Sequence, residues 1–263
     1  MNQNKNLKLA KIYAIVNQKG GVGKTTTAIN LATALSALNK KILIIDMDPQ
    51  GNASTGLGIE VAERKSTTYD LIIGNKTAKE VIVKTKIPNL KIITSTVDLS
   101  ACEIELVEVE NREYLLKNAL NLVQNDFDAI IIDCPPSLGL LTINALCACN
   151  SIIIPMQCEF FSLEGLSHLL NTIGLVKNNL NPEIQIAGVI LTMHDKRNKL
   201  TEQVEKDVRD YLGDKVYSNH IPRNIRMSEA PSYGLPGIIY DPKCLGSVAY
   251  LNLAKEVIAK EGL

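Results

Sequence analysis

Short apolar runs alternate along the chain with longer segments that contain both apolar and polar residues. The short runs predict buried strands, and the longer segments predict helices that cover them. We expect strands over residues 11–17, 42–46, 90–94, 129–133, 151–155, 184–191 and 215–219. We expect helices over residues 26–38, 68–73, 78–83, 100–124, 141–149, 163–178, 201–212 and 245–260, and loops over residues 47–58 and 222–242. This alternation predicts an α/β fold with a doubly wound, mostly parallel sheet, as a single domain over residues 1–263 with residues 1–10 flexible.

The composition limits how the chain can bind other molecules. Formal net charge is zero, so a protein that coats nucleic acid by overall charge is excluded, and any such binding needs a local patch. The charge is nevertheless uneven. Residues 98–113 contain six acidic residues against Arg112 alone, and residues 196–226 contain eight Lys or Arg against five Asp or Glu. The simplest interpretation of both runs is a solvated helix face.

Six cysteines are present without CxxC or zinc-ribbon spacing, which predicts reduced and mostly buried thiols. Residues 1–10 lack an apolar signal core, and no apolar run reaches the length of a membrane span. These features predict a soluble, cytoplasmic protein.

The segment 19–26 reads KGGVGKTT and directly follows the apolar run 12–16. Its glycines allow the backbone N–H groups to turn inward and form an anion nest, with Lys24 as a cation at its mouth. Thr25 is placed to hold Mg²⁺, and a helix from Thr26 adds its partial positive charge. The segment predicts a P-loop in which the nucleotide is bound by Gly20, Gly21, Val22, Gly23, Lys24, Thr25 and Thr26. Lys19 is a second lysine that phosphate binding alone does not require.

Aspartates end two of the predicted strands, at the sheet edge where α/β proteins bind ligands. Asp133 is suited to hold Mg²⁺ through water, with a helix N-cap as the alternative, and the stiff loop 134–137 after it is suited to sensing a γ-phosphate. Asp46 and Asp48 share a strand face, and one of them could orient the attacking water or, in the case of Asp46, join the Mg²⁺ shell through water. Ordinary turn formation is the alternative for this pair.

These motifs, in this order, resemble the ParA/Soj family of partition ATPases, in the deviant-Walker-A class that also contains MinD. The resemblance rests on KGGVGKTT, DMDPQGN, IIDCPPS, IPRNIRMSEAP and the closing helix, and it extends over nearly the whole chain. It implies a P-loop NTPase-like fold, slow ATP hydrolysis with Mg²⁺, and an ATP-dependent homodimer.

The resemblance also implies functions for individual residues. Lys19 matches the signature lysine that reaches across a dimer to the partner's nucleotide, Lys24 the P-loop lysine, and Asp48 the residue that aligns the hydrolytic water. Pro222 and Arg223 match the segment along the adenine. The catalytic set is therefore Lys19, Lys24 and Asp48, with Thr25 and Asp133 as metal residues.

Partner binding is implied in the same way. Arg197 and Arg226 match arginines that bind DNA without sequence preference in Soj-like members, and Lys196 and Lys199 belong to the same basic run. Such contacts to phosphate predict an affinity that falls steeply with salt. The family implies a ParB-type partner that accelerates hydrolysis through a short basic segment, and a nucleoid-associated ATP state. We interpret His194 and His220 as surface or loop histidines.

Other members of the class remain alternatives. Only 18 residues precede Lys19, which favours the short chromosomal type over the plasmid type with an N-terminal DNA-reading region. The last helix is balanced in charge and lacks aromatic residues, which makes it a poor membrane anchor. A MinD-like positioning ATPase is the main alternative, and a small-molecule kinase or synthetase is a weaker one because no second substrate constellation is evident.

Overall fold

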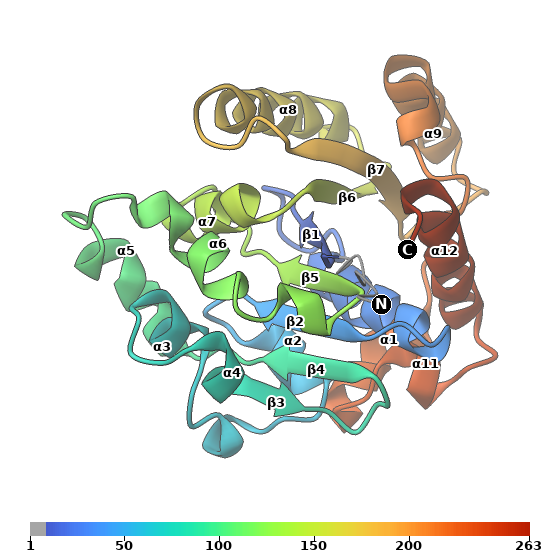
Figure 1. The fold of residues 1–263 in the computed structure, drawn as a ribbon. Coiled ribbons are helices and arrows are strands. Elements are labelled where there is room, and N and C mark those ends of the chain that lie inside the picture. The colour runs from blue at the N-terminus through green and yellow to red at the C-terminus, as the bar shows by residue number, and fades with distance from the viewer. Residues whose placement is uncertain (1–8) are drawn as a thin grey trace, which may run out of the picture.

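One sheet of seven strands forms the centre of the molecule (Figure 1). The computed structural model describes residues 9–263; residues 1–8, which belong to the segment predicted to be flexible, lie outside the described residues. The strand order is β3-β4-β2-β5-β1-β6-β7, and every neighbouring pair is parallel except β3 with β4. The strands are β1 (Lys11–Ile15), β2 (Ile42–Asp46), β3 (Ile82–Lys84), β4 (Leu90–Ile93), β5 (Ala129–Asp133), β6 (Ser151–Gln157) and β7 (Gln185–Thr192). The predicted doubly wound, mostly parallel α/β fold is confirmed.

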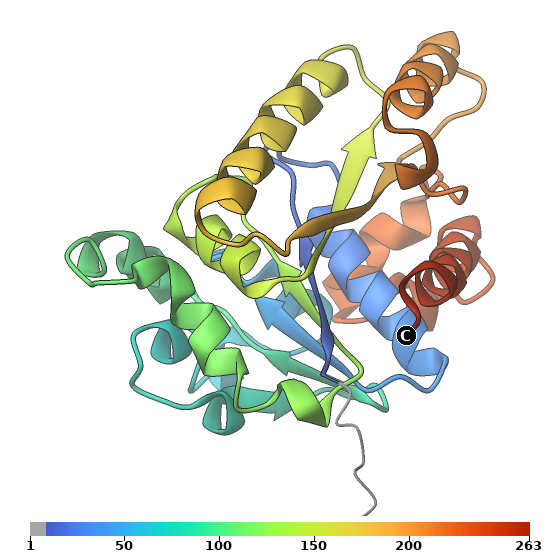
Figure 2. The same cartoon turned by 45° about the horizontal axis from the view of Figure 1, so that its top comes forward.

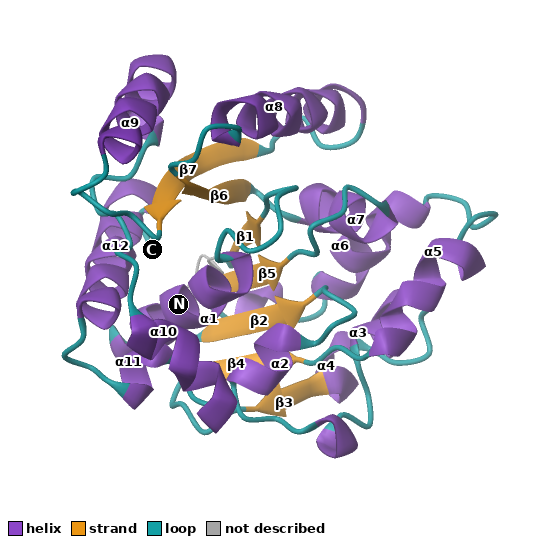
Figure 3. Cartoon of the chain, turned by 180° about the vertical axis from the view of Figure 1, so that it is seen from behind, coloured by secondary structure: helices purple, strands orange, loops and turns teal. Residues whose placement is uncertain are grey.

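Helices cover both faces of the sheet (Figure 2 and Figure 3). One apolar core lies between the sheet and a layer that includes α1 and α12, and the other lies between the opposite face and a layer that includes α6, α7 and α8. The strands are apolar on both sides because each of their faces meets one of these cores. The helices are α1 (Lys24–Ala37), α2 (Asn52–Gly56), α3 (Thr68–Ile72), α4 (Ala78–Val81), α5 (Cys102–Glu105), α6 (Leu115–Leu120), α7 (Leu140–Ala148), α8 (Ser162–Asn179), α9 (Lys199–Leu212), α10 (Ile225–Glu229), α11 (Gly237–Tyr240) and α12 (Leu245–Glu261).

The prediction of one long helix over residues 100–124 is wrong. Two 3-10 turns, the four-residue α5 and the six-residue α6 occupy this stretch, with irregular chain between α5 and the second turn. Asn111 has a φ of 56°, a left-handed conformation that a right-handed helix cannot continue through. The acidic run therefore lies largely on irregular chain, which projects at the rim of the molecule around α5 (Figure 1).

Three smaller predictions are also corrected. The second half of the helix expected over residues 78–83 is the antiparallel edge strand β3. The strand expected over residues 215–219 is reduced to an isolated bridge between Val189 and Val216. The loops expected over residues 47–58 and 222–242 contain the short helices α2, α10 and α11. Short helices of four or five residues carry too few periodic positions to be recognised from sequence.

The register of the central strands brings the candidate chemistry to one edge. Asp133 at the end of β5 is paired with Asp46 on β2 and with Ile15 on β1. In neighbouring parallel strands, paired residues direct their side chains to the same face, so both carboxylates lie on the α1 side of the sheet. Strand β1 lies between β5 and β6, so the P-loop that follows it emerges beside both carboxylates.

Asn181 provides a test of how this frame is held together. Its buried amide donates to the carbonyl oxygens of Leu146 (2.9 Å), Cys147 (3.3 Å) and Cys149 (2.8 Å), at the end of α7. Asn181→Ala should lower the free energy of unfolding by about 1–3 kcal/mol, because buried acceptors lose their donor. Urea unfolding measures the change. Asn179→Ala is the control, since that amide is exposed and donates to Leu175 alone; an equal loss in both variants would contradict the assignment.

Candidate functional site

The P-loop joins the end of β1 to the start of α1 in an open, left-handed conformation. Gly21 and Gly23 have φ values of 73° and 85°, which residues with a Cβ rarely adopt. Gly23 is the N-cap of α1 and supplies no side chain, so the first turn of the helix is left open to a ligand. A cleft of about 650 Å³ lies here, lined by Gly20, Gly21, Gly23, Lys24, Thr25, Thr26, Asp48, Pro49, Gln50, Asn52, Ser100, Pro136 and Met193.

Strands β6 and β7 hold the P-loop from the side. The Gln157 side-chain amide donates to the Gly21 carbonyl (3.0 Å), and the Thr192 hydroxyl donates to the Val22 carbonyl (2.8 Å). Asn17 accepts from the Lys19 backbone N–H (3.0 Å) and donates to the Pro155 carbonyl (2.7 Å). Sequence reasoning missed Asn17, Gln157 and Thr192, although each lies at or just beyond the carboxyl end of a strand. These contacts hold two carbonyls of the loop toward β6 and β7, which is compatible with the predicted nest of N–H groups on the cleft side.

The two lysines of the P-loop have different surroundings. Lys24 is buried, its Nζ donates to the Lys19 carbonyl at 3.0 Å, and burial lowers its pKa despite the nearby carboxylates. Lys19 is half-exposed, and its Nζ forms an ion pair with Glu159. The Lys24 ammonium is therefore bound within the P-loop itself, whereas the Lys19 ammonium is directed to the exposed loop between β6 and α8.

Asp133 is fully buried, and among residues 9–263 no donor lies within 3.5 Å of either carboxylate oxygen in hydrogen-bonding geometry, although the Thr25 hydroxyl is near enough to lower the Asp133 pKa. Burial raises its pKa well above the ordinary range, the Asp46 carboxylate raises it further, and Thr25 and Lys24 act in the opposite direction. Buried polar groups without partners are rare in folded proteins and mark sites that another group completes. A divalent cation fits this position, because it would neutralise the paired carboxylates and accept their oxygens as ligands or through water.

Asp46 differs from Asp133 because its oxygens are occupied. One oxygen accepts from the Ser54 backbone N–H (2.8 Å) and hydroxyl (2.7 Å), and the other from the Asp48 N–H (3.3 Å). Burial still raises the pKa of Asp46 to about 6. These bonds anchor α2 to the end of β2, so Asp46 has a structural function here, and its place in a metal shell stays a prediction.

Asp48 lies in the same cleft as Lys24 and Thr25. One of its carboxylate oxygens accepts from the Gln50 N–H at 3.0 Å, which holds the side chain at the turn that leads into α2. The structure therefore brings Asp48 together with the P-loop, as the sequence predicts.

Arg64, which sequence reasoning missed, holds in place the segment that contains α2. Its buried guanidinium donates to the carbonyls of Ile59 (2.7 and 3.1 Å) and Ser95 (3.0 Å) and to the Thr55 hydroxyl (2.7 Å). These four bonds fasten the segment after α2 to the end of β4.

A second, smaller cleft opens beside the first turn of α1. Pro222 and Arg223 line it together with Thr26, and its volume is about 230 Å³. The predicted base-binding pair thus lies next to the P-loop, although about 200 residues separate the two in the sequence.

The predicted DNA-binding residues are only partly brought together. Lys196 and Arg197 line a groove of about 720 Å³ that also contains Arg223, whereas Lys199 begins α9 and does not line it. Arg197 is bound by Asp195 through two bonds of 2.9 and 2.8 Å.

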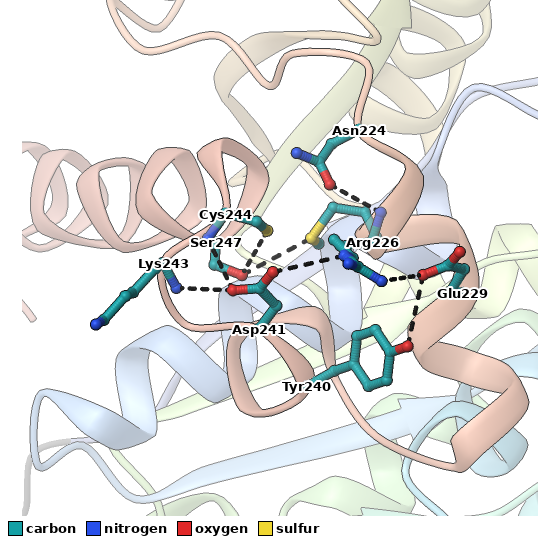
Figure 4. Close-up of polar contacts among 9 residues, drawn as sticks. Asn224, Arg226, Glu229, Tyr240, Asp241, Lys243, Cys244 and Ser247 are labelled. Atoms are coloured by element: carbon teal, nitrogen blue, oxygen red, sulfur yellow. Dashed lines mark hydrogen bonds and ion pairs between the residues drawn. The ribbon is translucent and has the colours of Figure 1, made fainter.

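Arg226 lies on α10, outside the lining of that groove, and carboxylates engage it. It pairs with Glu229 at 3.0 Å and with Asp241 at 3.7 Å (Figure 4). Glu229 also accepts from the Tyr240 hydroxyl at 3.5 Å, and Asp241 accepts from the first N–H groups of the turn before α12. The network joins α10 to α11 and α12, and it partly neutralises the predicted DNA contact.

His194 lies in the loop between β7 and α9, as one of the two interpretations expects, but it is buried and not at the surface. Only 2% of its side chain is exposed, and its Nε2 is 2.7 Å from Glu205. The His220 ring packs against it with centroids 4.2 Å apart, and burial together with His194 lowers the pKa of His220.

The cysteines follow the prediction more closely, because all six are free thiols and only Cys244 is not buried.

Comparison with known proteins defines the class of this nucleotide site. Residues 10–186 match the family model described as an AAA domain. The chain is 54% identical over 253 residues to the chromosome partitioning protein ParA of Caulobacter vibrioides, with 95% of each chain covered. It is 53% identical over 251 residues to the sporulation initiation inhibitor protein Soj of Bacillus subtilis, covering 95% of this chain and 99% of Soj. The chain belongs to the ParA/Soj family of chromosome-partitioning ATPases.

Solved structures agree on the fold. Cobyrinic acid a,c-diamide synthase of Mycobacterium smegmatis, with a bound ATP analogue and magnesium, matches with a TM-score of 0.84 and 32% identity over 97% of this chain and 98% of that one. The septum site-determining protein MinD of Pyrococcus horikoshii, complexed with Mg-ADP, matches with a TM-score of 0.78 and 26% identity over 97% and 98% of the two chains.

The Asp46–Ser54 contact provides a test of the site's scaffold. Ser54→Ala should lower the free energy of unfolding by about 1–3 kcal/mol, because Asp46 loses a donor and the Ser95 N–H loses its 3.1 Å acceptor. Denaturant unfolding measures the change. Ser36→Ala is the matched control: it is also buried, but its hydroxyl bonds only to the helical carbonyl of Ala32. An equal loss of unfolding free energy in both variants would contradict the function assigned to the Asp46–Ser54 contact.

Proposed function

We propose that this protein is an ATP-dependent dimerising switch that binds DNA without sequence preference and hydrolyses ATP to drive chromosome or plasmid partitioning with a ParB-type partner. The observation that carries the proposal is the separation of the two P-loop lysines. Lys24 is bound to its own loop, and Lys19 is directed outward to Glu159. A cation that its own loop does not use is available to a nucleotide held by a second copy.

ATP and Mg²⁺ are the proposed occupants of the P-loop cleft. The orphaned oxygens of Asp133 support a cation at this position, and Thr25 lies at the start of α1 beside it. Thr25 would hold Mg²⁺ through its hydroxyl and Asp133 through water. Bound Mg²⁺ neutralises charge that develops on the phosphates during phosphoryl transfer. Pro222 and Arg223 would lie along the adenine, in the cleft beside Thr26.

The chain's own residues would perform the remaining chemistry. Lys24 binds the phosphates and stabilises their charge, and the P-loop N–H groups orient them. Asp48, held by the Gln50 N–H, orients the attacking water at the cleft that it shares with Lys24. The products are ADP and phosphate. Turnover should be slow, because rapid hydrolysis would erase the dimeric state that the switch needs.

Dimerisation and DNA binding would then be linked through Lys19. Each Lys19 leaves Glu159 and crosses to the partner's nucleotide, and loss of the γ-phosphate weakens that contact. A dimer presents Lys196, Arg197 and Arg226 from both copies, so that several weak phosphate contacts act together. The ATP form would be associated with the nucleoid and the ADP form free in the cytoplasm.

The alternative is a MinD-like positioning ATPase that acts on a membrane surface or on another cargo. The match to a MinD structure supports this alternative. Within residues 9–263, no helix combines the length and hydrophobicity needed to cross a bilayer. Co-sedimentation with DNA and with anionic liposomes, each with and without ATP, separates the two proposals. Retention by DNA with ATP supports the partition switch, and retention by liposomes alone supports the alternative.

Lys19→Ala should retain ATP affinity within about threefold, because Lys24 and the loop N–H groups remain. The variant should lose ATP-dependent dimerisation and hydrolysis together. Molar mass in solution with ATP and with ADP, measured in an Asp48→Ala background that slows hydrolysis, gives the dimer population. Lys79→Ala on α4 is the matched control, because that lysine is also exposed. A Lys19 variant that dimerises and hydrolyses normally would reduce Lys19 to a surface charge.

Arg197→Ala combined with Arg226→Ala should keep dimerisation and lose DNA retention. Each phosphate contact contributes about 0.9 to the slope of log affinity against log salt, so removing two per copy should flatten that slope visibly. DNA binding across a salt series measures both effects.

Glu229→Gln is the matched variant, since it releases Arg226 from its 3.0 Å partner and removes a negative charge. It should raise DNA affinity. Unchanged DNA binding by the variant with both Arg197→Ala and Arg226→Ala would mean that the DNA-binding surface lies elsewhere on the molecule.

A further inference from the structure

Two of the chain's three histidines lie in the groove that Lys196, Arg197 and Arg223 line, which we call the basic groove. His194 and His220 both line this groove, and the nucleotide chemistry uses neither of them. Their rings pack against each other with centroids 4.2 Å apart and planes inclined by 32°. Histidine changes charge closer to physiological pH than other side chains do, so the proposed phosphate site contains two groups whose charge is adjustable.

His194 is the fixed member of the pair, because α9 holds it. Only 2% of its side chain is exposed, and its Nε2 is 2.7 Å from one Glu205 oxygen. The other oxygen of Glu205 accepts from Arg209 at 2.9 Å. Burial opposes the charge on Glu205, but the bonds from Arg209 and His194 lower its pKa, so the ionised carboxylate accepts a proton-bearing Nε2. Among residues 9–263, the buried Nδ1 of His194 has no hydrogen-bond partner, which is rare for a polar atom in the wall of a groove.

His220 is the member of the pair that reaches the surface of the groove, because it is only half-buried. Burial lowers its pKa, and His194 and Lys196 lower it further. Glu205 acts in the opposite direction, and Arg209 adds a smaller lowering effect. The charged groups on α9 and in the loop after β7 therefore keep the His220 ring neutral at neutral pH in the free chain.

The carboxylates nearest to the pair are engaged by other groups. Asp195 binds Arg197 through two bonds of 2.9 and 2.8 Å. On α12, which forms one side of the groove, Glu256 accepts from the N–H groups of Ser218 (2.8 Å) and Asn219 (3.2 Å). These contacts leave the carboxylates little capacity to balance a further positive charge in the groove.

Two cations of the basic groove form no ion pair. Within the described part of the chain, no salt bridge includes Lys196 or Arg223. Both line the same groove as His220. A phosphate bound there would attract the protonated ring of His220, which offsets the effects of burial and of Lys196 on its pKa. The protonated ring also donates from both nitrogens, whereas the neutral ring donates from one.

We propose that His220 is a contact to DNA phosphate in the basic groove and takes up a proton when DNA binds, an inference that rests on the DNA-binding function proposed above. His194 is a positioning residue in this scheme, because Glu205 holds it and its ring packs against His220. A phosphate that favours the protonated ring is favoured by that ring to the same extent. DNA affinity therefore rises as pH falls from about 8 to about 6, and the gain is lost as pH rises through the pKa of His220 in the complex.

The test measures binding of a short fluorescent DNA duplex by anisotropy, on the full chain with ATP, at constant ionic strength between about pH 6 and about pH 8. The chain carries Asp48→Ala, which slows the proposed hydrolysis and retains the ATP-bound dimer. Asp46, whose pKa burial raises to about 6, titrates over the same range in the nucleotide site. Molar mass is therefore measured at each pH, and variants are compared with the parent chain at the same pH.

His220→Gln removes the titrating ring and keeps a polar side chain. The parent chain should bind DNA about fivefold more tightly at about pH 6 than at about pH 8, and His220→Gln less than about twofold more tightly. His220→Lys should bind tightly at both pH values, because its charge does not change between them. His168→Gln is the matched control: His168 is exposed on α8, outside the groove, and its loss should leave the pH dependence intact.

Nuclear magnetic resonance of the histidine rings in the parent chain gives a second measurement, which holds even if a variant fails to fold. The chain has three histidines, so three ring signals are followed against pH. One of them should titrate below the ordinary histidine pKa in the free chain and at higher pH when DNA is bound. A chain in which DNA moves none of the three titrations would contradict the proposal.

The outcomes distinguish this inference from the proposed function. DNA binding by the ATP form with the same pH dependence in His220→Gln and in the parent chain overturns the proton-linked contact and leaves the partition switch standing. Absence of DNA binding at every pH, with an intact ATP-bound dimer, overturns the DNA-binding function and this inference with it.

Discussion

The buried carboxylate of Asp133 is the constraint around which the nucleotide site is arranged. The register that pairs it with Asp46 and Ile15 also places it beside the start of the P-loop. Burial without a donor among residues 9–263 costs stability, and the apolar strands on both sides of β5 offset that cost. The buried carboxylate lowers the stability of the fold when no cation is bound, and it suits a bound cation. Such a residue is typical of a site selected for function rather than for stability.

The P-loop shows the same division between scaffold and ligand. Its left-handed glycines would be mobile in isolation, but Gln157 and Thr192 fix two of its carbonyls from neighbouring strands. The loop is therefore preorganised before any phosphate arrives, which lowers the entropy that binding must overcome. Lys24 completes the P-loop within one chain. Because the loop needs no second lysine, the outward direction of Lys19 indicates a different function for that residue.

Sequence alone predicted the sheet, the place of the P-loop between a strand and a helix, and the position of Asp133 at the end of a strand, because each depends on a local pattern of apolar runs and turn residues. It failed where distant contacts decide the outcome. Residues 100–124 carry a helix-like pattern, yet Asn111 is left-handed and the inward anchors are Leu99, Cys102 and Leu106. The stacking of His194 on His220 and the pairing of Arg226 with Asp241 likewise depend on tertiary contacts with neighbouring segments, which no local sequence pattern reveals.

Although the formal net charge is zero, the acidic run and the basic groove form two surfaces of opposite sign, with the nucleotide cleft between them. Ser100, within the acidic run of residues 98–113, lines the cleft, and Met193 lines both the cleft and the base pocket that contains Arg223. Arg223 in turn lines the basic groove with Lys196 and Arg197. The nucleotide cleft therefore shares wall residues with the acidic run through Ser100, and with the basic groove through the base pocket and Arg223. Because the walls of the cleft continue into both charged surfaces, a ligand in the cleft would contact residues beside each of them, which is what coupling between distinct sites requires.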